Sequence, residues 1–281
     1  MLTCTKMNGN GNDFLVIDNM DLKHGTGVLS DYAVKLCRRR ESLGADGILA
    51  VEPSVEAEFK MRLFNRDGSE GEMCGNGARC IARYAFEKGI AKKNKMRFET
   101  LGGEINASVS GSRVTLKLAP VSLKDAVIDV PAKVNGVDFN YTFLTVGVPH
   151  TVIFKQKRTM TDEEYTVLGR AIRNRTDLFP EGTNVNFAVP RDGLDGGLDV
   201  VTYERGVEDL TLSCGTGSTA SAIAAVLIGI TGPQVNVWNP GGLNRVSLQF
   251  QSADTVLPEL EGGALYIADI QVAEDAFENN K

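Results

Sequence analysis

The stretch "GEMCGNGARCIARYAF", residues 71–86, places a cysteine directly in front of a Gly-Asn-Gly turn and a helix-forming run. The stretch "LTLSCGTGSTASAIAAVLIG", residues 210–229, repeats this arrangement around a second cysteine. The two runs predict helices over 77–88 and 216–228, each beginning just after its cysteine. Chance similarity of two glycine-led helices is the simpler explanation, but the shared Cys-Gly-x-Gly pattern favours a chain built from two related halves.

Alternating apolar and polar residues predict strands around both helices, for example over 59–65, 112–119, 245–251 and 265–273. Further helices are expected over 31–40 and 162–174, where Thr161 and Glu164 form a capping box. Antiparallel strands with segregated helices indicate an α+β fold. The expected domains are 1–118, which carries Cys74 and is completed by 266–281, and 119–265, which carries Cys214.

Composition excludes several classes of function. The formal charge of the 281 residues is −6, which argues against nucleic-acid binding. No apolar run reaches the roughly 18–20 residues of a membrane span, and the N-terminus does not read as a signal peptide, so a cytoplasmic protein is expected. Five cysteines without regular spacing do not suggest disulfides, and with two histidines no metal site is expected.

A helix N-terminus presents backbone N–H groups and the positive end of the helix dipole. It can therefore hold a carboxylate or phosphate, and it favours the thiolate of a cysteine placed there. A small residue filling a packed turn explains a single such cysteine, but explains two less well. Paired cysteines suit a redox enzyme, acyl transfer with a nearby histidine, or proton transfer at carbon. In the third case one thiolate removes an α-proton and the second thiol protonates the opposite face.

Seven segments in collinear order make the chain recognisable. It resembles the diaminopimelate epimerase family, whose members invert an amino-acid α-carbon with two cysteines and without pyridoxal phosphate. The segments that carry the resemblance are "KMNGNGNDFLVID" (6–18), "LGADGILAVEP" (43–53), "FNRDGSEGEMCGNGARC" (64–80), "GVPHTVIF" (147–154), "GTNVNF" (182–187), "YERGVED" (203–209) and "SCGTGS" (213–218).

The resemblance implies a fold, an activity and a set of site residues. The fold is two similar halves, each a mixed, mainly antiparallel sheet curled around a central helix. The activity is epimerisation of LL- to meso-diaminopimelate for lysine and cell-wall synthesis. No cofactor is implied; the partner is a small amino acid, and a homodimer is a possible assembly. Cys74 and Cys214 match the acid/base thiols, with Glu204 and His150 as polar partners beside them. The substrate-binding residues implied are Asn12, Asn65, Gly75, Asn76, Asn184, Arg205, Gly215 and Thr216.

The chain also departs from the family pattern. Asn8 and Asn10 stand where family members commonly have His and Leu, and Val148 replaces an asparagine that helps to fix the substrate. The segment between Glu204 and Cys214 is one residue longer than usual. Because Val148 cannot hydrogen-bond, a cofactor-independent racemase for another amino acid is the nearest alternative. A thiol redox protein and a non-enzymatic amino-acid-binding protein are two further alternatives.

Overall fold

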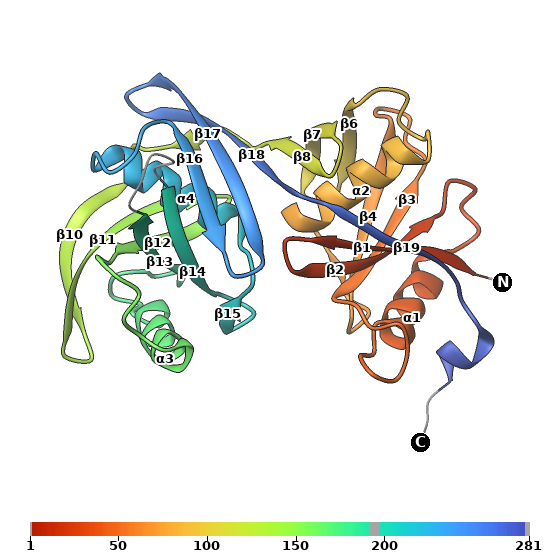
Figure 1. The fold of residues 1–281 in the computed structure, drawn as a ribbon, viewed down its shortest axis with the longest axis horizontal. Helices are drawn as coiled ribbons and strands as arrows, with labels where there is room; N and C mark the ends of the chain where they lie inside the picture. Colours follow the sequence, from red (N-terminus) through yellow and green to blue (C-terminus); the bar gives the residue numbers. More distant parts are fainter. Residues whose placement is uncertain (1, 192–196, 279–281) are drawn as a thin grey trace. The chain divides into compact units, whose positions relative to one another are not determined.

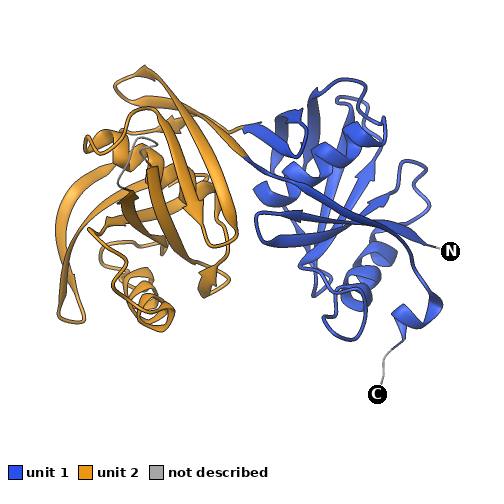
Figure 2. Ribbon diagram, viewed as in Figure 1, with its two compact units in different colours: residues 1–116, 262–281 blue, residues 117–261 orange. Residues whose placement is uncertain are grey.

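The computed structural model describes residues 2–191 and 197–278. The chain packs into two compact units, Met1–Leu116 with Gly262–Lys281 (unit 1) and Lys117–Glu261 (unit 2), coloured separately in Figure 2. The domain limits drawn from the sequence, 118/119 and 265/266, stay a proposal for where independent folding units begin and end.

The described residues of unit 1 form two α-helices and a mixed sheet (Figure 1). Its elements are β1 (Thr3–Gly9), β2 (Asn12–Asp18), α1 (Thr26–Leu36), β3 (Gly47–Glu52), β4 (Phe59–Asn65), β5 (Glu70–Gly71), α2 (Gly75–Glu87), β6 (Lys95–Thr100), β7 (Gly103–Ser110), β8 (Arg113–Lys117), β19 (Leu265–Gln271) and the 3₁₀ helix η1 (Glu274–Phe277). Strand β19 pairs with β1, so the end of the chain returns to this sheet.

Unit 2 repeats this plan (Figure 1). Its elements are β9 (Val121–Ser122), β10 (Val127–Val134), β11 (Val137–Val146), β12 (Val148–Phe154), α3 (Asp162–Arg173), β13 (Asn184–Arg191), β14 (Gly197–Glu204), β15 (Asp209–Thr211), α4 (Gly215–Leu227), β16 (Gln234–Asn239), β17 (Gly242–Ser252) and β18 (Thr255–Gly263).

The strand pairings show that the two units are built alike. In unit 1, β1 pairs antiparallel with β2, β2 parallel with β3, β3 antiparallel with β4, and β4 parallel with β6. In unit 2, β11, β12, β13, β14 and β16 follow the same series of directions. A parallel pair needs a crossover connection. Helices α1 and α3 occupy the first crossover of each unit, and α2 and α4 occupy the second.

Helices α2 and α4 are the central helices of the two sheets. Helix α2 contacts β1, β2, β3, β4, β7 and β19, and α4 contacts β11, β12, β13, β14, β16 and β17. A helix touched by strands from across its sheet requires that sheet to curve around it. The mixed, mainly antiparallel sheet curled around a central helix is therefore confirmed for each unit, within an α+β fold.

Strand periodicity sorts side chains between the two faces of the unit 2 sheet. On β13, Val185 and Phe187 belong to the core that packs on α3, together with Tyr165. Ala188 belongs to the other core, where it joins Ile223 of α4. Position 186 faces the same side as Ala188, so its asparagine lies on the α4 side of the sheet.

Three of the four helices expected from the sequence begin and end within two residues of the observed limits. The first does not, because α1 covers Thr26–Leu36 rather than 31–40 and starts at the N-cap Gly25. The expected capping box is present at the start of α3, where Thr161 and Glu164 bond reciprocally. Among the described residues, no helix has the length and apolar character needed to cross a membrane.

Candidate active site

Cys74 is the N-cap of α2, with extended backbone angles (φ −137°, ψ 120°). Its carbonyl oxygen accepts the first hydrogen bond of the helix, from the N–H of Ala78 at 2.7 Å. A Cβ added at Gly75 would meet no atom within 4 Å, whereas one at Gly77 would press on Leu49 at 3.2 Å. The first turn thus has an open position at Gly75 and a packed one at Gly77. An open backbone at a helix start is what an anionic ligand needs.

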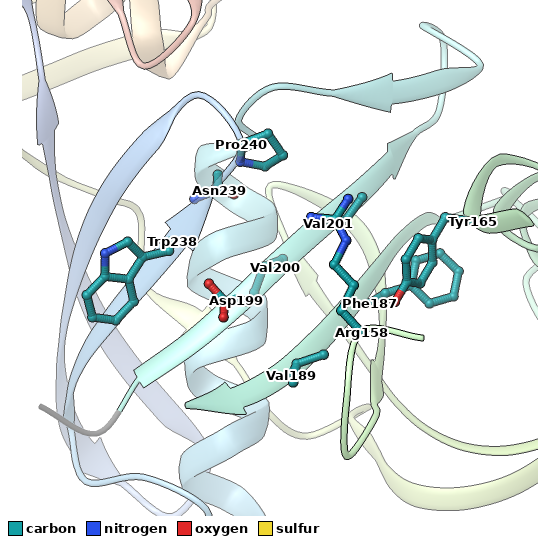
Figure 3. Close-up of a pocket in the computed structure, with 10 residues that line it drawn as sticks. All are labelled: Arg158, Tyr165, Phe187, Val189, Asp199, Val200, Val201, Trp238, Asn239 and Pro240. Carbon is teal, nitrogen blue, oxygen red and sulfur yellow. The ribbon is translucent and has the colours of Figure 1, made fainter. Parts of the chain in front are cut away.

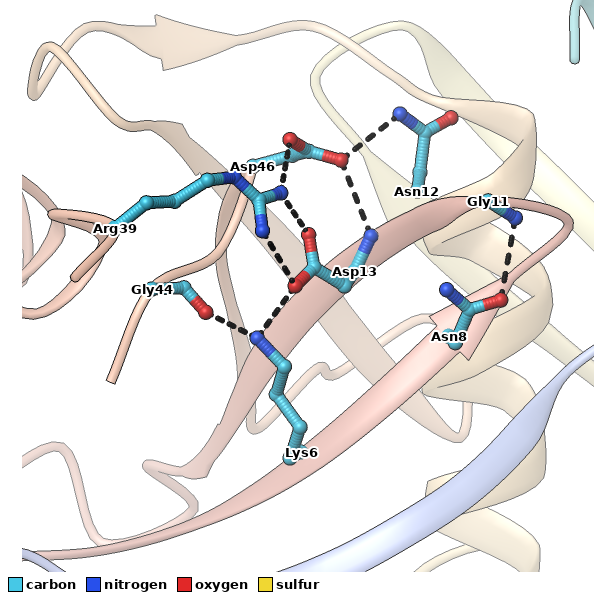
Figure 4. Close-up of polar contacts among 8 residues, drawn as sticks. All are labelled: Lys6, Asn8, Gly11, Asn12, Asp13, Arg39, Gly44 and Asp46. Carbon is cyan, nitrogen blue, oxygen red and sulfur yellow. Dashed lines mark hydrogen bonds and ion pairs between the residues drawn. The ribbon is translucent and has the colours of Figure 1, made fainter. Parts of the chain in front are cut away.

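Asn12 and Asn76 are joined side chain to side chain in unit 1. The Asn76 amide donates from Nδ2 to Oδ1 of Asn12 at 2.5 Å. Asn12 in turn donates from Nδ2 to Asp46 Oδ2 at 3.1 Å (Figure 4). Asn65 lies at the end of β4 and donates to Ser69 Oγ at 3.0 Å, in the turn that leads through β5 toward Cys74. The structure therefore brings Asn12 and Asn76 into contact and leaves Asn65 exposed at the end of β4.

Charged residues behind Asn12 form a network that the sequence did not reveal (Figure 4). Asp13 accepts hydrogen bonds from Lys6 at 2.6 Å and from Arg39 at 2.5 Å, and Arg39 also donates to Asp46 at 2.9 Å. Burial alone would raise the pKa of Asp13, but the bonds from Arg39 and Lys6 outweigh it and lower that pKa. Arg39 follows the end of α1 and contributes to this network although its side chain is 53% exposed.

The departures at positions 8 and 10 serve the turn between β1 and β2. Gly9 pairs with Asn12, so Asn10 and Gly11 are the two central residues, with φ of 50° and 97°. An Asn-Gly pair with positive φ at both positions is typical of a type I′ hairpin turn. Asn8 accepts from the N–H of Gly11 at 3.1 Å (Figure 4), and Asn10 accepts from Gly263 at 3.1 Å. Both asparagines therefore fix backbone in this chain.

Cys214 occupies the same position in unit 2. It is the N-cap of α4 (φ −109°, ψ 113°) and is only 6% exposed. Its Sγ accepts from the N–H of Gly217 at 3.3 Å and lies 3.5 Å from Oγ1 of Thr216. A Cβ at Gly215 would meet only the side chain of Leu260, at 2.8 Å. The sulfur is thus directed at the N–H groups of the helix start, where negative charge is favoured.

His150 is fully buried on β12 and held by Asn186, a residue that sequence reasoning did not select. The Asn186 Nδ2 lies 3.1 Å from the carbonyl of Thr151 and 3.2 Å from His150 Nδ1. Because a carbonyl can only accept, this Nδ2 is a donor, so His150 Nδ1 accepts and its proton sits on Nε2. Thr202 donates to Asn186 Oδ1 at 2.9 Å, which fixes the amide from its other end. Burial, with a smaller contribution from Arg205, lowers the pKa of His150 to about 3, so the ring is neutral.

Three further predicted site residues, Asn184, Glu204 and Arg205, also lie in unit 2. Asn184 pairs with His150 in the parallel register of β12 and β13, and its Oδ1 accepts from the Arg205 N–H at 2.7 Å. Burial raises the pKa of Glu204. The chain makes a tight turn between β14 and β15, with φ of 59° at Glu208 and a hydrogen bond from its N–H to the Glu204 carbonyl at 2.8 Å.

The predicted site residues thus fall into two groups. Unit 1 holds Asn12, Asn65, Cys74, Gly75 and Asn76; unit 2 holds His150, Asn184, Glu204, Arg205, Cys214, Gly215 and Thr216. Val148 is half-buried at the start of β12, two residues before His150. All five cysteines lie outside disulfides.

A separate cavity of about 220 Å³ in unit 2 contains none of these residues. It lies beside Tyr165 and Phe187, on the α3 side of the sheet, and Asp199, Arg158 and Trp238 line it (Figure 3). The cavity has no cysteine and no predicted site residue in its wall, so it is not part of the candidate active site.

Solved structures with this fold include amino-acid racemases and epimerases. A probable proline racemase from Agrobacterium radiobacter K84 matches with a TM-score of 0.67 and 15% identity, covering 99% of this chain and 94% of that one. A hydroxyproline epimerase from Agrobacterium vitis matches with a TM-score of 0.68 and 15% identity, covering 98% and 93%. These likenesses show that the chain has the fold of these structures.

Sequence comparison gives the family. The diaminopimelate epimerase family matches residues 4–123 and 142–259. The diaminopimelate epimerase of Caldanaerobacter subterraneus subsp. tengcongensis is 44% identical over 273 residues, covering 92% of this chain and 96% of that protein. The one of Archaeoglobus fulgidus is 40% identical over 277 residues, covering 94% of each. The chain belongs to the diaminopimelate epimerase family, a family of isomerases.

Proposed function

We propose that the protein epimerises LL-diaminopimelate to meso-diaminopimelate, in lysine and peptidoglycan precursor synthesis. The observation that carries this proposal is identity of 40–44% with diaminopimelate epimerases over more than nine-tenths of the chain. A cysteine at the N-cap of each central helix supports it chemically. The cytoplasmic location and the homodimer expected from the sequence stay predictions.

The proposed chemistry is two-base proton transfer without pyridoxal phosphate. One cysteine, as thiolate, takes the α-proton and becomes a thiol. The other, as thiol, gives its proton to the opposite face of the same carbon and becomes a thiolate. The α-carbon is thereby inverted, and the reverse reaction uses the two sulfurs in exchanged roles. The substrate carboxylate is proposed to bind the first-turn N–H groups of α2 and α4, which also stabilise charge that develops on it.

The polar residues of unit 2 have proposed roles that follow from their contacts. His150 is neutral and carries its proton on Nε2, so it can donate a hydrogen bond without adding a charge. That suits a partner which donates a hydrogen bond to a thiolate rather than one which transfers protons. Arg205, Asn184, Asn12 and Asn65 are proposed to hold the amino and carboxylate groups of the substrate, including those at its distal centre.

The test is turnover of LL-diaminopimelate by the purified protein under reducing conditions, with meso product separated by chiral chromatography. A panel of other L-amino acids is run in parallel, because Val148 is the one feature that favours another substrate. Formation of meso-diaminopimelate supports the proposal. Racemisation of another amino acid with no reaction of diaminopimelate would reassign the substrate. Activity that survives replacement of both Cys74 and Cys214 by serine would refute the proposed chemistry.

A further inference from the structure

Arg79 is a buried cation in the second turn of α2. Its side chain is 0% exposed, and it carries a guanidinium that stays protonated at physiological pH. Its Nε donates to the Gly263 carbonyl at 3.2 Å, and its Nη2 donates to Asn76 Oδ1 at 2.6 Å. Its Nη1 has no partner among residues 2–191 and 197–278. Within the same residues no carboxylate pairs with it, so its charge is not neutralised.

Such a charge is unfavourable for folding. Removing an ion from water is costly unless an opposite charge compensates it. Burial accordingly lowers the pKa of Arg79, while negative charge on Cys80 or Cys74 would favour its charged form. Other buried positions of α2 hold Ala78, Ile81 and Ala82, which fill the core without this cost. A guanidinium kept at this place therefore points to a negative group that is present only during function.

The side chain is directed back toward the helix start. Arg79 can only donate and Asp46 can only accept, so the two asparagine amides between them are oriented in one direction. Asn76 accepts from Arg79 and donates to Asn12. Asn12 accepts from Asn76 and donates to Asp46, which Arg39 holds from the far side (Figure 4). Neither amide can flip without losing both of its bonds.

The residue of α4 that is equivalent to Arg79 is neutral. Five residues after Cys214 the chain has Thr219, whose Oγ1 donates to the Gly215 carbonyl at 3.0 Å. Ser218 donates to the Cys214 carbonyl at 2.9 Å and accepts from Asn244 at 2.9 Å. The hydroxyls of Ser218 and Thr219 thus bond the backbone at the start of α4, whereas α2 has a guanidinium at the position of Thr219.

We propose that Arg79 is a positioning residue for the reaction: its buried guanidinium orients the amide of Asn76 and places a permanent positive charge behind the helix start that carries Cys74. This deepens the proposed function and rests on it. The charge favours the thiolate at Cys74 and the substrate carboxylate at the same helix start. Arg113 of β8 adds positive charge near Arg79 and is left in place in every variant below.

Two substitutions separate charge from hydrogen bonding. Arg79→Gln keeps an amide donor but removes the charge, and Arg79→Lys keeps the charge but loses the guanidinium fork. Arg83→Gln is the matched control, because Arg83 lies one turn further along α2, donates to the Ala264 carbonyl at 2.6 Å and has Glu87 as a partner. Circular dichroism shows whether each variant is folded.

The first readout is the rate at which iodoacetamide alkylates Cys74, divided by the rate at Cys214 in the same sample, measured by peptide mass spectrometry. The ratio is expected to fall about threefold or more in Arg79→Gln and to recover in Arg79→Lys. The second readout is turnover of LL-diaminopimelate. Arg79→Gln should lower kcat/KM about tenfold or more, and a higher KM should account for part of this decrease. Arg83→Gln should leave both readouts unchanged.

A folded Arg79→Gln protein with an unchanged labelling ratio and unchanged kcat/KM would overturn the proposal. If Arg79→Gln does not fold, the pH dependence of cysteine labelling in the unmodified protein tests the proposal instead. Between about pH 9 and about pH 6 the labelling rate of Cys74 should fall less than that of Cys214. Equal or reversed behaviour would overturn the proposal. The labelling does not require turnover, so a wrong substrate assignment would show only in the activity assay.

Discussion

Lowering the pH should destabilise unit 2 through His150. The neutral ring is fully buried and its pKa is lowered from 6.5 to about 3. Between these values the unfolded chain binds a proton that the folded chain does not, so stability falls as pH falls. At pH 7 the group contributes little to the pH dependence. At pH 5, about 1.5 pH units below the pKa of histidine in the unfolded chain, protonation of the unfolded chain lowers the free energy of unfolding by about 2 kcal/mol relative to pH 7.

The single tryptophan provides the assay. Trp238 lies on β16 of unit 2, the unit that contains His150, so its fluorescence reports unfolding of the relevant unit. Urea unfolding at pH 7 and pH 5 gives the loss of stability for the natural protein and for His150→Asn. Asparagine keeps an acceptor near the Nδ1 position but does not titrate. The natural protein should lose about 2 kcal/mol more than the variant between the two pH values.

Two features of the protein isolate the contribution of His150 in this comparison. Burial raises the pKa of Glu204, which contributes pH dependence of the opposite sign, and that contribution is shared by both proteins. The chain has two histidines, so carbon-13 labelled histidine gives two ring signals, and the one absent from His150→Asn belongs to His150. That signal should not titrate between about pH 8 and about pH 5. Titration near pH 6.5, or equal acid sensitivity of the two proteins, would refute the reasoning.

Two further substitutions test the local structure. Gly217→Ala should lower kcat/KM about tenfold or more, because the added Cβ overlaps Oδ1 of Asn186 and displaces the start of α4. The control is Gly27→Ala, where an added Cβ meets nothing within 4 Å. Equal kinetics for the two variants would contradict the prediction. Thr161→Ala removes the capping box of α3 and should cost about 1 kcal/mol by urea unfolding followed at Trp238; unchanged stability would show that the cap contributes nothing.

The sequence predicted the central helices and the cysteine at the start of each one well, because local chemistry determines both. A glycine-rich turn followed by residues that form helices readily is a local signal that favours a helix start. The first helix was placed too late, since Gly25 and Gly27 read as loop residues, whereas α1 begins between them. Burial of Leu29, Ala33 and Leu36 stabilises that helix, and burial is not visible in a short stretch of sequence.

Sequence reasoning missed the residues that support the site. Arg79 reads as an ordinary helix residue, yet it is fully buried and donates to Asn76. Asn186 alternates with Asn184 along β13, and period-two alternation would have placed both on the face opposite Val185 and Phe187. Asp46 could not have been linked to Asn12, because their contact spans 34 residues and depends on the parallel pairing of β2 with β3.

The two-base epimerisation of diaminopimelate is tested most directly by following LL-diaminopimelate in D2O by proton NMR, at low conversion and under reducing conditions. The account predicts that the first meso product carries deuterium at the inverted carbon, while the remaining LL substrate keeps its α-proton. Replacing either Cys74 or Cys214 by alanine should abolish this conversion. Deuterium entering the LL substrate as fast as product forms, or protium retained in the product, would indicate a single base and contradict the account.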